Sequence, residues 1–467
     1  MQKKVIFLLF GGFDVCGYIL MCNCRLFFLK KIVSLLRFLL SMEKLMQYVW
    51  QHRLWPSGEM KTVDGRDVHI IDPGKINTDA GPDFFNAKVR IGNEMWVGNV
   101  EIHFRASDWL RHHHDKDEAY DSVILHVVDK DDMPIRRRNG DIIPQLRMPC
   151  SPDFHQRYMH LVGSSHLELP CREVIAQMPG VHISTWMTAL AMERLYRKVD
   201  GINALLDRYN GDWEEVCYIT LARCLGFGVN SDVFERLAQS MPLRFMGKHS
   251  DSLLSIEALL FGQSGMLDAV DAADEYTRSL RREYDFLANK FSLRRPEGMA
   301  WKMARMRPAN SPHRRIAFLA SLIYGGFGLM SQIVSAQDEA QARALFQSPM
   351  TGYWANHYAI GVPSSRALEV LSQASINVLI VNVVVPLTYA YGAKRGDEEM
   401  CERAMQMLQQ LPAERNSVVD LFVNAGIKCR DAFTSQAMVQ LRREYCEAHK
   451  CLYCRIGHRM LAAKNSQ

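Results

Sequence analysis

Two acidic side chains and a histidine stand where they could act on one metal ion. Asp83 follows Pro82, and Glu101 and His103 are two residues apart in a stretch that alternates between polar and apolar residues. Carboxylate oxygens are the ligands that Mg²⁺ and Mn²⁺ prefer, and a bound divalent ion can activate water for hydrolysis. We therefore expect Asp83 and Glu101 to bind Mg²⁺ or Mn²⁺ and to form a catalytic site with His103.

The elements that must position these residues are the two strands of a β-hairpin. Apolar side chains recur at every second residue in 85–91 and again in 96–104, which is typical of half-buried strands. The Gly-Asn pair at 92–93 is a suitable two-residue hairpin loop. If Ile91 pairs with Glu94 across this loop, the apolar faces of both strands coincide, which supports the register.

In this register Asp83 needs a local irregularity to reach the site. Glu101 and His103 project from one face, and Asp83 lies level with them, opposite Ile102. Ideal alternation points Asp83 to the other face of the sheet. A one-residue bulge near Gly98, or a bend before the strand, would bring its carboxylate round.

The order of these residues resembles the motif of the PD-(D/E)XK nucleases. Asp83 comes first, then a hairpin, and then Glu101-Ile102-His103. The resemblance implies a metal held by two carboxylates and a backbone carbonyl, and cleavage of DNA or RNA. It also implies the expected order of elements: a helix over 42–55, three strands, a helix and another strand. His103 replaces the usual lysine, so it would orient water or phosphate without a fixed positive charge.

A histidine cluster offers zinc as an alternative to magnesium. Ser107 is predicted to cap a short helix that contains the histidine run 112–114. His126 lies in a following strand. His103, His114 and His126 could together bind zinc, which would make the protein a zinc-dependent hydrolase.

The C-terminal tail carries four soft ligands within 13 residues: Cys446, Cys451, Cys454 and His458. This spacing is typical of a structural Cys₃His zinc site. Alternatively, Cys429 replaces His458 and four cysteines hold a [4Fe–4S] cluster, as in some PD-(D/E)XK nucleases. Either centre would clamp the chain end to the helical body.

Three arginines near two prolines are candidate nucleic-acid contacts: Arg307, Arg314 and Arg315. Guanidinium groups in such a segment could contact a phosphate backbone. A basic loop that caps a helix is the other interpretation.

Several segments identify the chain as similar to an uncharacterised bacterial family, domain of unknown function 2851, common in Bacteroidetes. They are GPDFFNA (81–87), GNVEIH (98–103), SDW (107–109), AYD (119–121), LHVV (125–128), RPANSP (307–312) and the stretch 377–386. The resemblance extends from residue 42 almost to the C-terminus. It implies no activity.

The predicted fold class is α+β. We expect a small α/β domain with a mixed sheet, a linker, a large all-helical domain and a Cys/His metal-binding tail, over 42–150, 151–180, 181–445 and 446–467. Helices are predicted at 251–262, 273–292, 313–330, 337–346, 365–374, 397–410 and 431–449. The β-branched stretch 378–385 is predicted to be a buried helix with polar anchors.

Residues 1–41 differ from the rest of the chain. An apolar run follows Lys3-Lys4, but Asp14 interrupts it and no cleavage site follows. The second run, 32–40, is too short to span a bilayer. We interpret 1–41 as an upstream mis-start before Met42, or, if translated, as a membrane-associated segment.

Composition leaves the function open. The net charge of +5 permits a nucleic-acid partner without requiring one, and the sequence indicates neither a protein partner nor an oligomeric state. The 12 cysteines are scattered, which favours free thiols in a reducing, cytoplasmic compartment. The leading hypothesis is a metal-dependent nuclease-like phosphodiesterase. The alternatives are a non-catalytic interaction module with a structural metal site, and a zinc-dependent hydrolase.

Overall fold

The computed structural model describes most of the chain between residues 42 and 462. The described residues are 42–55, 59–77, 79–148, 152–163, 169–268, 274–303, 311–347, 350, 352–364 and 371–462. They form two compact units. The first contains the residues up to Cys171 and those from Lys450 onward, and the second is Arg172–His449. The segment 1–41 lies outside the described residues, so the mis-start prediction is untested.

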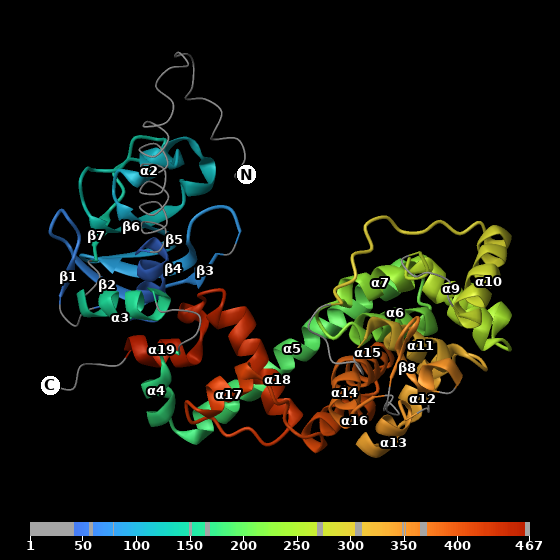
Figure 1. The fold of residues 1–467 in the computed structure, drawn as a ribbon. Helices are drawn as coiled ribbons and strands as arrows, with labels where there is room; N and C mark the ends of the chain where they lie inside the picture. The colour runs from blue at the N-terminus through green and yellow to red at the C-terminus, as the bar shows by residue number, and fades with distance from the viewer. Residues whose placement is uncertain are drawn as a thin grey trace, which may run out of the picture. The chain divides into compact units, whose positions relative to one another are not determined.

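The first unit is built on a mixed sheet (Figure 1). Its strands lie in the order β1 (Met60–Lys61), β2 (Asp67–Asp72), β4 (Phe84–Ile91), β5 (Glu94–Arg105), β6 (Val123–Lys130) and β7 (Gln145–Arg147), and β3 (Lys75–Ile76) pairs with β4. The pairs from β1 to β5 are antiparallel. β6 is parallel to β5 and to β7. Parallel neighbours need a crossover connection, and α2 (Asp108–Arg111) with two 3₁₀ turns lies in the one between β5 and β6.

Apolar side chains cover both faces of this sheet. On one face, Leu45 and Trp50 of the helix over 42–51 pack with Val89 and Ile102 of the strands. On the other, Trp109 of α2 belongs to a separate core cluster with Tyr120, Val128 and Ile143, among others. Burial on both faces explains why β6 is buried along nearly its whole length.

The segment predicted to be a linker is largely helical. Its described residues include α3 (Pro152–Gly163) and α4 (Arg172–Gln177). Phe154, Tyr158 and Leu161 of α3 are buried in the core on the sheet's first face, opposite α2 (Figure 1). Their helical spacing makes an apolar stripe, so α3 belongs to the first unit rather than to a connection.

The C-terminal segment also belongs to the first unit. Leu452, and Leu461 of α19 (Arg455–Ala462), are buried in the same core as α3. The predicted tail domain 446–467 is therefore divided, because Cys446 lies in the second unit.

In its described residues the second unit is helical apart from the short pair β8 (His357–Ala359) and β9 (Val362–Pro363). The α-helices are α5 (Gly180–Arg208), α6 (Trp213–Leu225), α7 (Ser231–Ser240), α8 (Leu243–Met246), α9 (Leu253–Gln263), α10 (Glu275–Phe291), α11 (Pro312–Ile323), α12 (Leu329–Ser335), α13 (Glu339–Ala344), α14 (Gln373–Leu379), α15 (Val385–Arg395), α16 (Glu398–Gln410), α17 (Ser417–Val423) and α18 (Ala432–Gln440). These include helices at most of the predicted positions.

One predicted helix differs in the structure, and another is largely untested. The helix expected over 313–330 is divided into α11 and α12, because Gly325 and Gly326 adopt positive φ values of 83° and 104°. Most of the helix expected over 365–374 lies outside the described residues.

The stretch 378–385 is helical, as predicted. It includes a π-helix, Ile380–Val384, between α14 and α15. The continuous helix Gln373–Arg395 is long and apolar enough to cross a membrane, but 67% of its apolar window is buried inside the protein. Its apolar composition is therefore explained by its position in the core of the second unit. Its polar anchor Asn382 donates to the carbonyl of Val378 at 2.8 Å.

Candidate metal centre

A β-bulge on β4 sets the position of Asp83. Near the loop, β4 and β5 pair in the predicted register, Ile91 with Glu94. The register shifts by one residue before Phe84 is reached. Asn86 is the extra residue: its φ is 56°, and its N–H donates to the Asn99 side chain at 3.3 Å.

The predicted bulge is thus present, but on the strand opposite Gly98. The backbone there is tightly packed, since a Cβ on Gly74 would lie 2.5 Å from the carbonyl oxygen of Phe85. The extra residue brings Asp83 level with Glu101 instead of Ile102.

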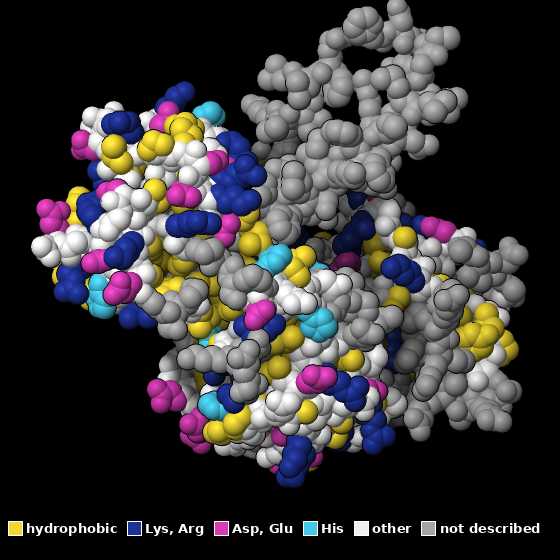
Figure 2. Space-filling view, turned by 90° about the vertical axis from the view of Figure 1, so that its left-hand side faces the viewer, with side chains coloured by type: hydrophobic (Ala, Val, Ile, Leu, Met, Phe, Trp, Pro, Cys, Tyr) yellow, Lys and Arg dark blue, Asp and Glu magenta, His cyan; other side chains and the backbone are white. Residues whose placement is uncertain are grey.

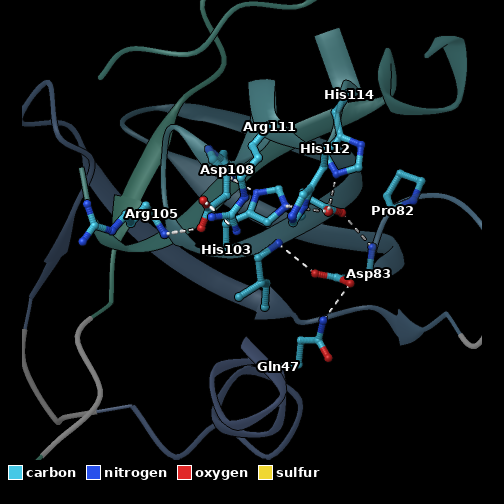
Figure 3. Close-up of polar contacts among 12 residues, drawn as sticks. Gln47, Pro82, Asp83, His103, Arg105, Asp108, Arg111, His112 and His114 are labelled. Atoms are coloured by element: carbon cyan, nitrogen blue, oxygen red, sulfur yellow. Dashed lines mark hydrogen bonds and ion pairs between the residues drawn. The ribbon is translucent and has the colours of Figure 1, made fainter. Parts of the chain in front are cut away.

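Asp83 and Glu101 are in direct contact. The Asp83 N–H donates to Glu101 Oε2 at 3.0 Å, and Asp83 Oδ2 accepts from the Ile102 N–H at 2.9 Å. Gln47, from the helix over 42–51, donates to Asp83 Oδ1 at 2.8 Å (Figure 3). Asp83 and Glu101 are therefore adjacent, but the Asp83 carboxylate is held by Gln47 and Ile102, and the metal site predicted to be shared by the two carboxylates stays a prediction.

Three histidines cluster beside Glu101, and two of them contact its other oxygen. Figure 3 shows His103, His112 and His114 side by side. Glu101 Oε1 lies 3.4 Å from His103 Nε2 and 3.4 Å from His114 Nε2. His112 Nδ1 lies 3.1 Å from His103 Nε2. One nitrogen from each of the three histidines lies within 4.8 Å of the other two.

The spacings around His103 Nε2 match those between neighbouring ligands of one tetrahedral metal ion. Zinc–nitrogen and zinc–carboxylate bonds of about 2.0–2.1 Å place tetrahedral ligands about 3.3–3.4 Å apart. The contacts of 3.1 to 3.4 Å around His103 Nε2 are close to that value. The mixed imidazole and carboxylate set suits zinc or another first-row transition metal better than Mg²⁺, which prefers oxygen ligands.

His126 supports this group without joining it. Its Nε2 lies 2.9 Å from His103 Nδ1, and its side chain is fully buried. This contact at Nδ1 directs the other ring nitrogen of His103, Nε2, toward Glu101 and His112. Metal-binding histidines usually make such a supporting hydrogen bond through the nitrogen that does not bind the metal. The predicted set of His103, His114 and His126 is therefore corrected: His112 takes the place of His126.

The turn after α2 explains how His112 and His114 reach one site. The predicted helix over the histidine run is not formed, because α2 ends at Arg111 and His113 adopts a left-handed φ of 63°. This reversal leaves His113 exposed while its two neighbours face His103. At the start of α2, Asp108 Oδ2 accepts from the Arg105 N–H at 3.1 Å, and the predicted cap Ser107 instead contacts Asp132.

Burial keeps the site close to neutral when no cation is bound. It raises the pKa of Asp83 to about 7 and that of Glu101 to about 8, and the charge of Glu101 also raises the pKa of Asp83. Burial lowers the pKa of His103 well below its usual value and that of His126 to about 3. A cation would offset the cost of ionising these buried carboxylates.

Glu43 is a further acidic group that the sequence did not single out. It lies on the helix over 42–51, and burial with the charge of Asp108 raises its pKa to about 7. Its Oε1 is buried and has no hydrogen-bond partner among the described residues. A buried acceptor without a hydrogen-bond donor lowers the stability of the folded protein. A cation or a substrate proton bound near Glu43 would offset that loss.

Comparison of the sequence with known protein families shows to which family the chain belongs. The profile of the family described as "Protein of unknown function (DUF2851)" matches residues 43–417. The chain belongs to this family. No curated protein and no solved structure matches it. Because the family's description gives no activity, the function has to be argued from the site.

The tail ligands lie beyond the residues matched to the DUF2851 family. Cys451, Cys454 and His458 are in the first unit, whereas Cys446 is in the second. Cys171 lies close enough to Cys451 and Cys454 for their charges to add to the effect of burial, which raises its pKa to about 12. In the described part of the chain, these cysteines form no group of three ligand atoms within 4.8 Å, so the zinc or [4Fe–4S] centre stays a prediction.

The predicted arginine contacts to nucleic acid are corrected for two of the three residues. Arg314 and Arg315 are only 1% and 2% exposed. Arg314 donates to the carbonyls of Trp354 and His357 at 2.5 and 3.1 Å. Both side chains are thus buried inside the second unit, because the apolar face of α11 carries them inward. Arg307 lies outside the described residues.

Proposed function

We propose that the first unit is a metal-dependent hydrolase that cleaves phosphodiester bonds. The observation that carries the proposal is the cluster of His103, His112 and His114, with Glu101 in contact with the first and the last of them. A divalent ion held there would supply Lewis-acid chemistry: polarisation of a phosphoryl oxygen and activation of water.

The neighbouring acids, Asp83 and Glu43, would accept and release protons during the reaction. Asp83 is held beside Glu101 by Gln47 and Ile102. Its pKa and that of Glu43 are raised to about 7, the range in which a group can both accept and release a proton at neutral pH. We assign Asp83 the role of general base, and Glu43 that of a second proton carrier.

The nuclease-like topology supports a phosphodiester substrate. The first unit has a helix, three consecutive antiparallel strands, a crossover with a helix, and a strand parallel to the third. Asp83 just before β4 and Glu101 within β5 follow the order of the motif, which supports this proposal. The proposed metal differs from the expected Mg²⁺, since the histidines favour zinc or manganese.

Elemental analysis and a cleavage assay test the proposal together. The purified full chain is expected to bind one equivalent of Zn²⁺ or Mn²⁺ at the histidine site, and to cleave single- or double-stranded DNA or RNA with that metal. Glu101→Gln and His112→Ala should lose cleavage by about a hundredfold or more, because each removes a direct ligand. His113→Asn is the matched control, because His113 is exposed and asparagine tolerates its left-handed φ.

The outcomes separate the candidate functions. Stoichiometric metal without cleavage of any nucleic acid would favour the non-catalytic module. Metal-dependent hydrolysis of simple esters but not of phosphodiesters would favour the zinc hydrolase. Equal cleavage by wild type and Glu101→Gln would overturn the assigned site.

A further inference from the structure

A large cavity lies within the second unit, formed only by residues between Arg194 and Arg443. Its volume is about 1290 Å³, more than the roughly 300–1,000 Å³ of common ligand pockets. Residues of α5, α6, α7, α17 and α18 line it, together with residues of the helix 373–395.

The charge of this cavity is predominantly positive. Six cationic side chains line it (Arg194, Arg197, Lys198, Arg208, Arg223 and Arg443) against three acidic ones (Asp232, Glu235 and Glu414). Arg223 pairs with Glu235 and Asp232, and Arg197 pairs with Glu444. Within the described residues, the other four cations form no ion pair with a carboxylate. The cavity therefore has positive charge available for an anion.

Two of these cations are buried against a single neutral group. Arg194 is 9% exposed, and its Nε donates to Gln436 Oε1 at 2.6 Å. Lys198 Nζ donates to the same oxygen at 2.8 Å and to the Val381 carbonyl at 3.1 Å. Glu414 faces the pair through Gln436, whose Nε2 donates to its carboxylate. The two cations therefore contact the Glu414 carboxylate only indirectly, through the side-chain amide of Gln436.

Burial of uncompensated charge at this place is costly. It lowers the pKa of Lys198 to about 7 and that of Arg194 to about 10. The charge of Arg194 further lowers the pKa of Lys198, and the charges of Arg197 and Arg443 further lower that of Arg194. A negatively charged ligand that binds here would offset this cost and so stabilise the folded protein. Phosphate oxygens are suitable partners for guanidinium and ammonium groups.

Two π-helices contribute to the cavity wall. Asn382 comes from the π-helix Ile380–Val384, and Arg443 comes from the π-helix Leu441–Cys446. The carbonyl that receives Lys198 also belongs to the first of these. Single π-helical turns are rare and occur frequently at functional sites.

Part of the remaining wall is apolar and includes an aromatic ring. Leu205, Phe227 and Val439 line it. Phe227 has a positive φ of 45°, and the buried Arg315 guanidinium lies 4.4 Å from the centre of its ring. A planar heterocycle could rest on such a surface, while its phosphates reach the cations.

We propose that this cavity binds a nucleotide, with its phosphates at Arg194, Lys198 and Arg443 and its base on the apolar wall. The proposal stands apart from the metal centre and does not depend on it. The same chemistry fits a free nucleoside diphosphate or the 5′-phosphorylated end of a short oligonucleotide.

Calorimetric titration of the full chain tests this site with four probes: ADP, pyrophosphate, adenosine and a 5′-phosphorylated trinucleotide. ADP or the trinucleotide is expected to bind, pyrophosphate more weakly, and adenosine scarcely at all. Lys198→Gln and Arg443→Gln should each weaken binding about tenfold, because each removes one charge-assisted contact. Arg395→Gln is the control: it removes an exposed cation of α15 that does not line the cavity.

Thermal unfolding establishes that each variant folds. Arg443 is exposed, so Arg443→Gln remains informative if Lys198→Gln is unstable. Binding of the trinucleotide but not of ADP would identify a nucleic-acid end as the source of the phosphate. Binding of adenosine as tight as that of ADP, equal affinity of Arg443→Gln and wild type, or no binding by the folded protein would overturn the proposal.

Discussion

At the scale of single residues, one left-handed turn decides the composition of the metal centre. His113 reverses the chain at a φ of 63°, so His112 and His114 meet His103 while His113 itself faces solvent. A non-glycine residue at positive φ is uncommon, and a run of three histidines gives no sign of which one adopts it. This is why the sequence pointed to His114 and missed His112.

A partly buried histidine in the second unit, His313, is expected to make stability depend on pH. Burial lowers the pKa of His313 to about 4, against about 6.5 in an unfolded chain. Between these values the unfolded chain binds more protons, so the free energy of unfolding should fall as the pH drops from 6.5 to 4. The largest expected loss is about 3 kcal/mol, measured by urea unfolding at pH 7 and pH 4.5.

The variant His313→Gln isolates this contribution, because glutamine does not titrate in that range. Its free energy of unfolding should fall less than that of wild type between the two pH values. His182→Gln is the control, since His182 is exposed and its loss should leave the pH dependence unchanged. Identical pH dependence in His313→Gln and wild type would contradict the assignment.

At the scale of elements, the bulge in β4 links the sheet to its chemistry. A bulge inserts one residue and reverses the alternation beyond it, and here it lies between the well-paired hairpin loop and Asp83. Asn86 satisfies its N–H through Asn99, which stabilises the irregular backbone. Beyond the bulge Phe84, rather than the predicted Phe85, is buried in the core, and Asp83 before it is redirected as well.

Deletion of Asn86 is expected to separate these two roles. Without the extra residue, Asp83 moves back to a position opposite Ile102 and loses its contacts to Glu101 and Gln47. The hairpin should still fold, because pairing from Ala87 to the loop does not depend on the bulge. We expect cleavage to fall about a hundredfold while circular dichroism stays close to that of wild type.

Asn86→Gly is the matched variant, because glycine accepts a φ of 56° and keeps the residue count. It should retain most of the cleavage activity. If the deletion variant cleaves as well as Asn86→Gly, the bulge has no part in placing Asp83.

At the scale of the whole molecule, the chain leaves the first unit at Cys171 and returns to it at Lys450. Leu452 and Leu461 then complete the core beneath the sheet, and His458 Nδ1 contacts the hydroxyl of Tyr48 on the helix over 42–51. On the face drawn in Figure 2, basic and acidic side chains are interspersed, so the surface there gives no single-sign field for a polyanion. Positive charge is gathered instead in the cavity of the second unit.

The returning segment should contribute measurably to the stability of the first unit. Leu461 is 1% exposed, and Leu461→Ala is expected to cost about 2–4 kcal/mol. Calorimetry should show an earlier transition for the first unit and an unchanged one for the second. Val423→Ala is the control: Val423 is 44% exposed, so its change should stay within about 0.5 kcal/mol. Equal unfolding of Leu461→Ala and wild type would show that α19 adds nothing to this core.

Much of the local structure could be predicted from the sequence. The alternation in 85–91 and 96–104 predicted the hairpin and its register, and helical spacing predicted helices such as α9, α10 and α16. Segment 151–180 was misjudged, because its Pro, Ser and charged residues concealed the stripe of Phe154, Tyr158 and Leu161. That stripe becomes visible only against the core it covers.

The sequence by itself determined which residue types could do chemistry and which short elements carry them, because those patterns depend on neighbours a few residues away. Only the tertiary structure decided that three histidines cluster beside Glu101, that Arg314 is buried, and that cations from α5 and the π-helix after α18 share one cavity. Such meetings depend on contacts between distant segments, and a one-residue bulge or a single left-handed turn is enough to change them.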